Sequence, residues 1–214
     1  MKESPYYFEI KDLMAQFITA FDNVVIKRYN INRKQEDRIS VRYVYAPKQR
    51  VLYDIITTGQ TMTLPAISIT ISKVSRDVTR VFNKLDGFSY SELSNKKSGI
   101  LRSPVPINIS VNMSIITRFQ TDLYQILSNF GSYNNPYVVI SWPIPKEFNL
   151  PSVQEIRSEV LWDGNVSIDN PIDLNGQQKP RVVANTTFVI KGWLFKKDSA
   201  PVSNIYYIEV NTNV

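Results

Sequence analysis

The stretch that most constrains how this chain folds is PINISVNMSIITRFQTDLYQIL, residues 106–127, because the spacing of its apolar residues changes once. Up to Ile115 every second residue is apolar, which is the period of a strand with one buried face. After Thr117 the apolar residues recur three or four positions apart, which is the period of a helix that packs on one side. The sequence therefore predicts a long strand that runs directly into a helix lying across a sheet.

The predicted strand is long as well as regular. Its apolar face consists of Ile107, Ile109, Val111, Met113 and Ile115, and its polar face of Asn108, Ser110, Asn112 and Ser114. Eleven residues at about 3.3 Å each span roughly 36 Å, about twice the common strand length. We therefore expect a sheet whose strands reach well beyond the helical layer.

The helix that follows carries its own start and stop signals. Thr117 and Gln120 fit a capping box, in which the two side chains satisfy free backbone donors. Gly131 stands where a left-handed residue would end the helix. The predicted buried stripe between these signals consists of Phe119, Leu123, Ile126, Leu127 and Phe130.

The rest of the chain alternates between apolar patterns and polar turns. A first helix is predicted to begin at Ser4 and Pro5 and to bury Ile10, Leu13, Met14, Phe17, Ile18 and Phe21. Extended segments are predicted at 24–29, 39–46, 64–72, 137–140, 181–195 and 205–210, the first two as a hairpin, and Asp163-Gly164 is a hairpin signal. Residues 48–58 fit either a helical turn or a strand, and the polar segment 83–103 is expected to form a long loop or arm.

These elements predict an α+β protein. Residues 1–214 are expected to form a single domain, with a long, mainly antiparallel sheet and two main helices packed on it. No internal repeat or linker divides the chain. No window approaches 18 apolar residues, and the start MKESPYYFEI lacks an apolar run behind a basic patch, so we expect neither a membrane span nor a signal peptide.

The composition argues against catalysis. The chain contains no histidine and no cysteine, which removes the usual general base, the commonest metal ligand and thiolate chemistry. Glu155 and Glu159 are the closely spaced carboxylates of note, but they lie in a segment read as extended. Asp163, Asn165, Ser167 and Asp169 alternate as in a calcium loop, yet the glycine and the final glutamate are misplaced. We therefore expect no catalytic residue, no metal site and no cofactor.

Charge and aromatic content leave two kinds of contact open. The net charge is +6, and residues 1–50 and 73–102 each carry a net +4. A basic surface toward an acidic partner or DNA would consist of Arg76, Arg80, Lys96, Lys97 and Arg102; scattered solvated charge is the alternative. The Tyr-rich region 39–53 fits a nucleic-acid-binding module, although such residues more often form cores or protein interfaces. A hydrolase that uses carboxylates alone is a third class.

Five segments in a fixed order resemble a known family. They are FDNVVIKR (21–28), VRYVYAPK (41–48), LPAISITI (64–71), PINISVNMSIITRFQTDLYQIL (106–127) and FVIKGWLF (188–195). Their order and spacing, over roughly residues 15 to 197, are similar to those of the tail sheath stabiliser, or tail completion protein, of T4-like contractile-tailed phages. The chain departs from family members that carry long C-terminal extensions, because it ends soon after GWLF.

The resemblance implies a structural virion protein with a tail-terminator-like fold and no catalytic residues. It implies a homohexameric ring that caps the tail, stabilises the sheath and gives the head and neck a docking surface. The implied partners are further copies of the chain, the tail tube terminator, the terminal sheath ring and head–neck proteins, with DNA passing through the ring without sequence-specific contacts. The implied location is the tail top or neck of the virion, and the host cytoplasm during assembly.

Overall fold

Two long antiparallel strands, β7 (Val105–Thr117) and β10 (Val182–Leu194), form the centre of the fold. The structure is a computed structural model that describes residues 7–32, 34–57, 64–81, 87–92, 97–134, 137–145, 154–169, 181–196 and 202–203. The two strands pair without interruption along their whole length, so that Ile109 lies opposite Ile190 and Val111 opposite Phe188. The predicted long strands at 106–115 and 181–195 are therefore confirmed.

The central pair belongs to a six-stranded sheet in the order β3-β4-β7-β10-β9-β8. The other members are β3 (Arg42–Tyr45), β4 (Ala66–Arg76), β8 (Val138–Pro143) and β9 (Glu155–Asp169). Strands β3 and β4 run parallel, and the remaining neighbours in this described sheet are antiparallel. The α+β class and the long, mainly antiparallel sheet are thus confirmed.

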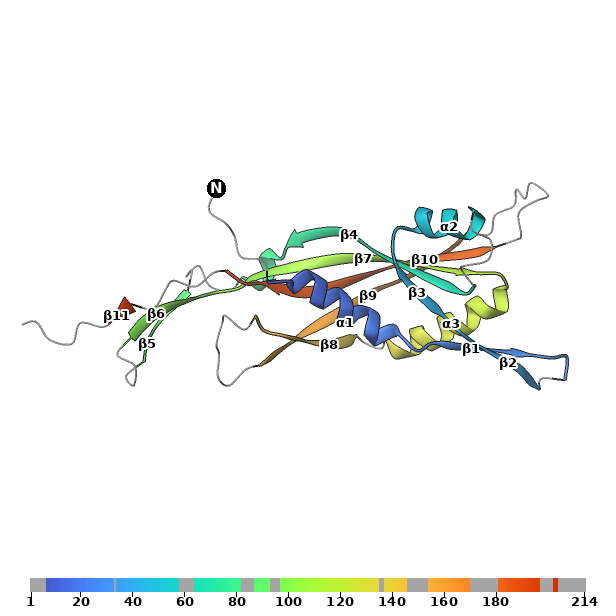
Figure 1. Cartoon of the computed structure of the whole chain (residues 1–214), viewed down its shortest axis with the longest axis horizontal. Coiled ribbons are helices and arrows are strands. Elements are labelled where there is room, and N and C mark those ends of the chain that lie inside the picture. The colour runs from blue at the N-terminus through green and yellow to red at the C-terminus, as the bar shows by residue number, and fades with distance from the viewer. Residues whose placement is uncertain are drawn as a thin grey trace, which may run out of the picture.

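Helices α1 (Glu9–Phe21) and α3 (Gln120–Tyr133) lie against one face of this sheet (Figure 1). Phe188, at the middle of β10, is fully buried between them. Its ring centroid lies 5.4 Å from that of Phe17, 5.2 Å from that of Phe21 and 6.0 Å from that of Phe130. Truncating such a buried ring costs about 3–5 kcal/mol. This aromatic cluster holds both helices to the same face.

The opposite face has a smaller core at one end. Val51 of α2 (Lys48–Thr57) packs with Ile116 and Val183, which lie on the reverse side of their strands from the main core. Of the segment 48–58, which fitted a turn of helix or a strand, the described residues 48–57 form a helix. The described part of the chain holds three α-helices, where the sequence indicated two main ones.

Hairpins project at the two ends of the long axis of the molecule (Figure 1). At one end β1 (Val25–Tyr29) pairs with β2 (Gln35–Ser40), as the sequence predicted. The predicted strand 39–46, however, divides at the buried Val41 into β2 and β3, which belong to different sheets. At the other end β5 (Gly87–Glu92) pairs with β6 (Lys97–Arg102), and β11 (Val202–Ser203) adds to β6. The sequence predicted a long loop or an arm at 83–103; its two described strands form a projecting hairpin, which fits an arm and not a loop.

Helix α1 begins at Glu9, not at Ser4 and Pro5 as predicted. Phe8, with φ of 60°, precedes the first turn, and its side chain makes no capping hydrogen bond. The buried Glu9 carboxylate instead accepts a hydrogen bond from the backbone N–H of Phe195, at 3.1 Å. A contact with the end of β10 therefore accompanies the observed start of the helix.

Helix α3 also begins later than its sequence signal. Thr117 stays in β7 opposite Val182, and the helix begins at Gln120, whose side chain donates to the Tyr124 hydroxyl at 2.5 Å. The predicted capping box is therefore wrong, because pairing with β10 keeps Thr117 in the strand. Phe119 is 45% exposed, although Leu123, Ile126 and Phe130 form the predicted buried stripe. Gly131 lies inside the helix, which continues to Tyr133.

Asp163-Gly164 does not form a hairpin. Strand β9 continues through it, and Gly164 adopts φ of 80° where the pairing with β10 shifts between Thr186 and Phe188. The dipeptide therefore forms a β-bulge, which uses the same left-handed glycine as a turn. The predicted strand at 137–140 is confirmed as β8, and that at 64–72 as β4. The predicted strand at 205–210 lies outside the described residues.

Replacing Gly131 tests the revised end of α3. A Cβ at this position meets no atom within 4 Å, and the residue is helical, so Gly131→Ala is expected to stabilise the protein by about 0.5–1 kcal/mol. Gly164→Ala is the matched control and is expected to destabilise, because its φ is positive. Urea denaturation measures both. A destabilising Gly131→Ala would restore the predicted left-handed cap.

Candidate interaction surfaces

The face of the sheet away from α1 and α3 is polar and open over its middle. Strand pairing places Ser114 between Ser68 and Asn185, and Asn112 between Thr70 and Thr187. These neutral hydroxyl and amide side chains follow the alternation seen in the sequence, and α2 covers one end of the face. A neutral polar sheet face of this kind suits contact with another surface better than chemistry on a substrate.

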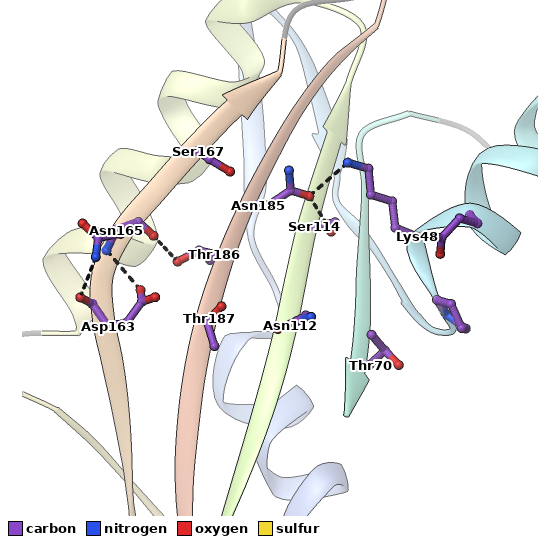
Figure 2. Close-up of a pocket in the computed structure, with 12 residues that line it drawn as sticks. Lys48, Thr70, Asn112, Ser114, Asp163, Asn165, Ser167, Asn185, Thr186 and Thr187 are labelled. Carbon is purple, nitrogen blue, oxygen red and sulfur yellow. Dashed lines mark hydrogen bonds between the residues drawn. The ribbon is translucent and has the colours of Figure 1, made fainter. Parts of the chain in front are cut away.

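A groove of about 400 Å³ lies where this face meets the start of α2 (Figure 2). Lys48 reaches across it, with its Nζ 3.2 Å from Asn185 Oδ1 and 3.4 Å from Asp169 Oδ2. The Ser114 hydroxyl donates to Asn185 Oδ1 at 2.8 Å, and the Asn185 amide donates to Asp169 at 2.9 Å. This network ties α2 to three strands and uses the donors and acceptors that a ligand would need.

The four alternating residues that resembled a calcium loop line the far side of this region in β9. Asp163 Oδ1 accepts from the backbone N–H of Asn165 at 3.0 Å, and the Asn165 carbonyl accepts from Thr186 at 2.7 Å. These bonds stabilise the bulge. Among the residues that the structure describes, no group of three or more acidic side chains could hold a metal ion.

The carboxylate pair Glu155 and Glu159 lies exposed on β9, which confirms that the segment is extended. Glu155 accepts a hydrogen bond from the Ser141 hydroxyl at 2.5 Å. This contact joins β9 to β8 side by side. Glu155 therefore has a structural hydrogen-bond partner on β8, and this contact does not assemble an acid, a base and a nucleophile.

Arg80 is engaged inside the protein. Its guanidinium donates to Asp77 at 2.9 Å and to the carbonyls of Ile107 and Gly192, at 2.5 and 3.2 Å, and lies 4.8 Å from the centre of the Trp193 ring. The short 3₁₀ helix η1 (Val78–Arg80) is thereby fastened to both β7 and β10. The positive charge of Arg80 is therefore paired with Asp77 within the fold.

Asp77 is the acidic half of this network and is buried. Hydrogen bonds from the Thr79 hydroxyl, at 2.6 Å, from Arg80 and from the Thr79 backbone N–H hold the pKa of its carboxyl well below the usual range, against the opposing effect of burial. The ionised form is therefore favoured by the fold.

The other predicted basic residues are placed differently. Arg76 is exposed at the end of β4, and Arg102 is half-buried at the end of β6. Both lie at the end of the sheet from which the β5–β6 hairpin projects (Figure 1). Lys97 begins β6, and Lys96 lies outside the described residues.

The Tyr-rich region 39–53 is divided among β2, β3 and α2. Tyr43 is half-buried, and its hydroxyl donates to the Phe21 carbonyl at the end of α1. Burial, and secondarily the nearby charge of Asp22, raises the pKa of Tyr43 above its ordinary value. This tyrosine therefore supports the core, while Tyr45 and Tyr53 are exposed.

Sequence reasoning missed the contacts that anchor the β1–β2 hairpin to α3. The Gln125 side chain accepts from the Lys27 backbone N–H at 2.9 Å and donates to the Lys27 carbonyl at 2.8 Å, as a neighbouring strand would. Arg28 forms an ion pair with the buried Asp122 at 2.9 Å. Residues 94 to 98 positions apart make these contacts, so no local pattern could reveal them.

The chain resembles proteins of contractile phage tails and of a contractile injection system. Residues 5–213 match a family described as T4-like virus Myoviridae tail sheath stabiliser. The chain is similar to tail completion protein gp15 of Enterobacteria phage T4, with 25% identity over 93 residues, which are 44% of this chain and 33% of that protein. A sheath/tube terminator in the extended state, from the cryo-EM structure of an extracellular contractile injection system (PVC), aligns with a TM-score of 0.37 and 9% identity, covering 99% of this chain and 65% of that one.

The family match over residues 5–213 identifies a structural protein of contractile phage tails. The chain belongs to the tail sheath stabiliser family of T4-like viruses. The comparisons do not support the nucleic-acid-binding alternative. No helix in the described ranges has both the length and the apolar character needed to cross a bilayer.

Acid titration tests the Asp77–Arg80 network. The unfolded carboxyl takes up a proton near pH 4, whereas the folded one resists it, so its stabilising contribution is present above about pH 4 and lost as the pH falls further. Asp77→Asn is therefore expected to lower stability at pH 7 and to flatten its decline between pH 5 and 2. Urea denaturation of both proteins across this range measures it; parallel curves would contradict the lowered pKa.

Proposed function

We propose that the chain forms a hexameric ring that caps the phage tail, stabilises the extended sheath and offers the head and neck a docking surface. The observation that carries this proposal is the family match over residues 5–213, nearly the whole chain. The proposed partners are the tail tube terminator, the terminal sheath ring and head–neck proteins. The proposed location is the tail top or neck, after assembly in the host cytoplasm.

The strand edges supply a physical basis for assembly. Strand β3 pairs with β4 only from Ala66 to Ile69, so among the described strands the outer edge of β4 from Thr70 onward has no neighbour. Exposed residues Ser72, Lys73 and Val74 occupy this edge. Open edges of this kind accept a strand from another chain. Contacts between unlike surfaces of identical copies form a ring when their rotation closes.

Addition of the purified chain to tails tests the proposed cap. Tails with extended sheath but no completed end are expected to keep their full length on incubation, with one ring at the end away from the baseplate in negative-stain images. Light scattering of the ring is expected to give about six times the chain mass of 24.7 kDa. Sheaths that contract or shorten equally with and without the chain would contradict the role.

We also propose that the end of the sheet near the β5–β6 hairpin presents a basic surface to an acidic partner or to DNA in the ring, with Arg76 as its exposed described member and with Lys96, Lys97 and Arg102 contributing. Arg76→Glu is expected to reduce tail–head joining several-fold without lowering the thermal midpoint, because an exposed charge contributes little to stability. Arg157→Glu, on exposed β9, is the matched control. Unchanged joining by Arg76→Glu would remove this surface from the account.

A further inference from the structure

The tip of the β1–β2 hairpin is an ordered turn that displays an apolar side chain. Asn30 Oδ1 accepts hydrogen bonds from the backbone N–H groups of Asn32 and Lys34, both at 3.0 Å, and the Asn30 N–H donates to the Lys34 carbonyl at 3.0 Å. Ile31, within this turn, is fully exposed. These hydrogen bonds join residues on either side of Ile31, and contact of an isoleucine side chain with water is unfavourable.

The direction of the hairpin is fixed by its base. Gln125 closes the inner edge of β1 at Lys27, and the Arg28–Asp122 ion pair fastens the next residue to α3. Beyond these contacts the hairpin extends past the end of the helical layer (Figure 1). The contacts at the base of the hairpin therefore fix the direction in which it points. We call Ile31 at its tip the knob.

A pocket lies within the helical layer, where α1 and α3 both end and the chain leads into β1. Its volume is about 240 Å³, and its apolar lining consists of Ala20, Phe21, Val24, Phe130 and Tyr133. Asp22 and Tyr133, both exposed, border it. Neither helix carries a basic residue in its last turn, so no cation of their own offsets the partial negative charge of the two C-termini, where the Asn134 amide donates to the Phe130 carbonyl and the Tyr43 hydroxyl to the Phe21 carbonyl. The pocket thus combines apolar side chains with an acidic one, Asp22, at its border.

We propose that Ile31 of one copy inserts into this pocket of the next copy. The charges are complementary, because the exposed Lys27 and Lys34 lie on either side of the knob in the hairpin, and the exposed Asp22 borders the pocket. Knob and pocket lie on different parts of one chain, so every copy presents one and accepts one, which is the head-to-tail arrangement that a ring requires. This inference rests on the proposed ring and names the contact that joins its subunits.

Cysteine cross-linking tests the contact directly, because the chain contains no cysteine of its own. Ile31→Cys and Asn129→Cys proteins are mixed in equal amounts and oxidised; Asn129 is an exposed residue that lines the pocket. A disulfide-linked dimer is expected in the mixture. Ile31→Cys mixed with Val78→Cys, at an exposed residue of η1, is the control and is expected to remain monomeric on a denaturing gel.

A substitution at the knob gives an independent measurement. Ile31→Asp is expected to weaken self-association about 10- to 100-fold in light scattering, because an isoleucine leaves the interface and a carboxylate meets the acidic border of the pocket. Val78→Asp is the matched control, since Val78 is an exposed apolar residue on η1, and it is expected to leave association unchanged. Circular dichroism of each variant confirms folding.

The outcomes separate this contact from the ring itself. Rings that persist in Ile31→Asp and show no Ile31–Asn129 cross-link overturn the contact and leave the ring proposal in place. A chain that stays monomeric both alone and on tail ends overturns both. Cross-linking of Ile31→Cys to a sheath or tube protein on capped tails, with none to Asn129→Cys, shows that the knob serves another partner and overturns this inference.

Discussion

The antiparallel ladder between β7 and β10 is the constraint on which the rest of the structure depends. Because side chains alternate along a strand, this single register sends Ile109, Val111 and Phe188 toward the helices and the Asn, Ser and Thr residues to the opposite side. A slip by one residue would bury the polar set and expose the apolar one. The same ladder therefore creates the core that receives α1 and α3 and leaves a neutral polar face for contact.

At each end of the sheet and its helices, a hydrogen-bonded network with an ion pair, here called a polar lock, lies at the base of a projecting hairpin. At one end Arg80 bonds to Asp77, to β7 and to β10, close to where the chain leaves for β5 and β6. At the other end Gln125 and Asp122 of α3 fix β1. Buried charges are costly unless they are paired and hydrogen-bonded, and both locks are paired. An isolated two-stranded hairpin is only marginally stable in water, and the polar locks give each of these hairpins a defined direction relative to the sheet.

The sequence predicted what short-range periodicity controls and failed where distant contacts decide. The long strands, the stripe of α3 and the α+β class follow from alternation over ten or more residues. The capping box failed because Thr117 pairs with Val182, and the turn at Asp163-Gly164 became a bulge because β10 continues beside it. Within the candidate surfaces, Arg80 looked like a surface charge because sequence does not reveal that Gly192 and Trp193 lie next to it.

In the proposed assembly the partners are recognised by the shape and chemistry of their surfaces, and this chain presents three kinds of surface. The sheet edge at β4 offers backbone groups, the open face offers neutral hydroxyls and amides, and the β1–β2 tip offers one apolar side chain on a basic support. Backbone pairing alone is permissive, because any extended strand fits it. An apolar knob that must find an apolar pocket with an acidic border adds the discrimination that edges lack. Self-recognition at the tip, together with the edge, would therefore leave the open face for the neighbouring tail proteins.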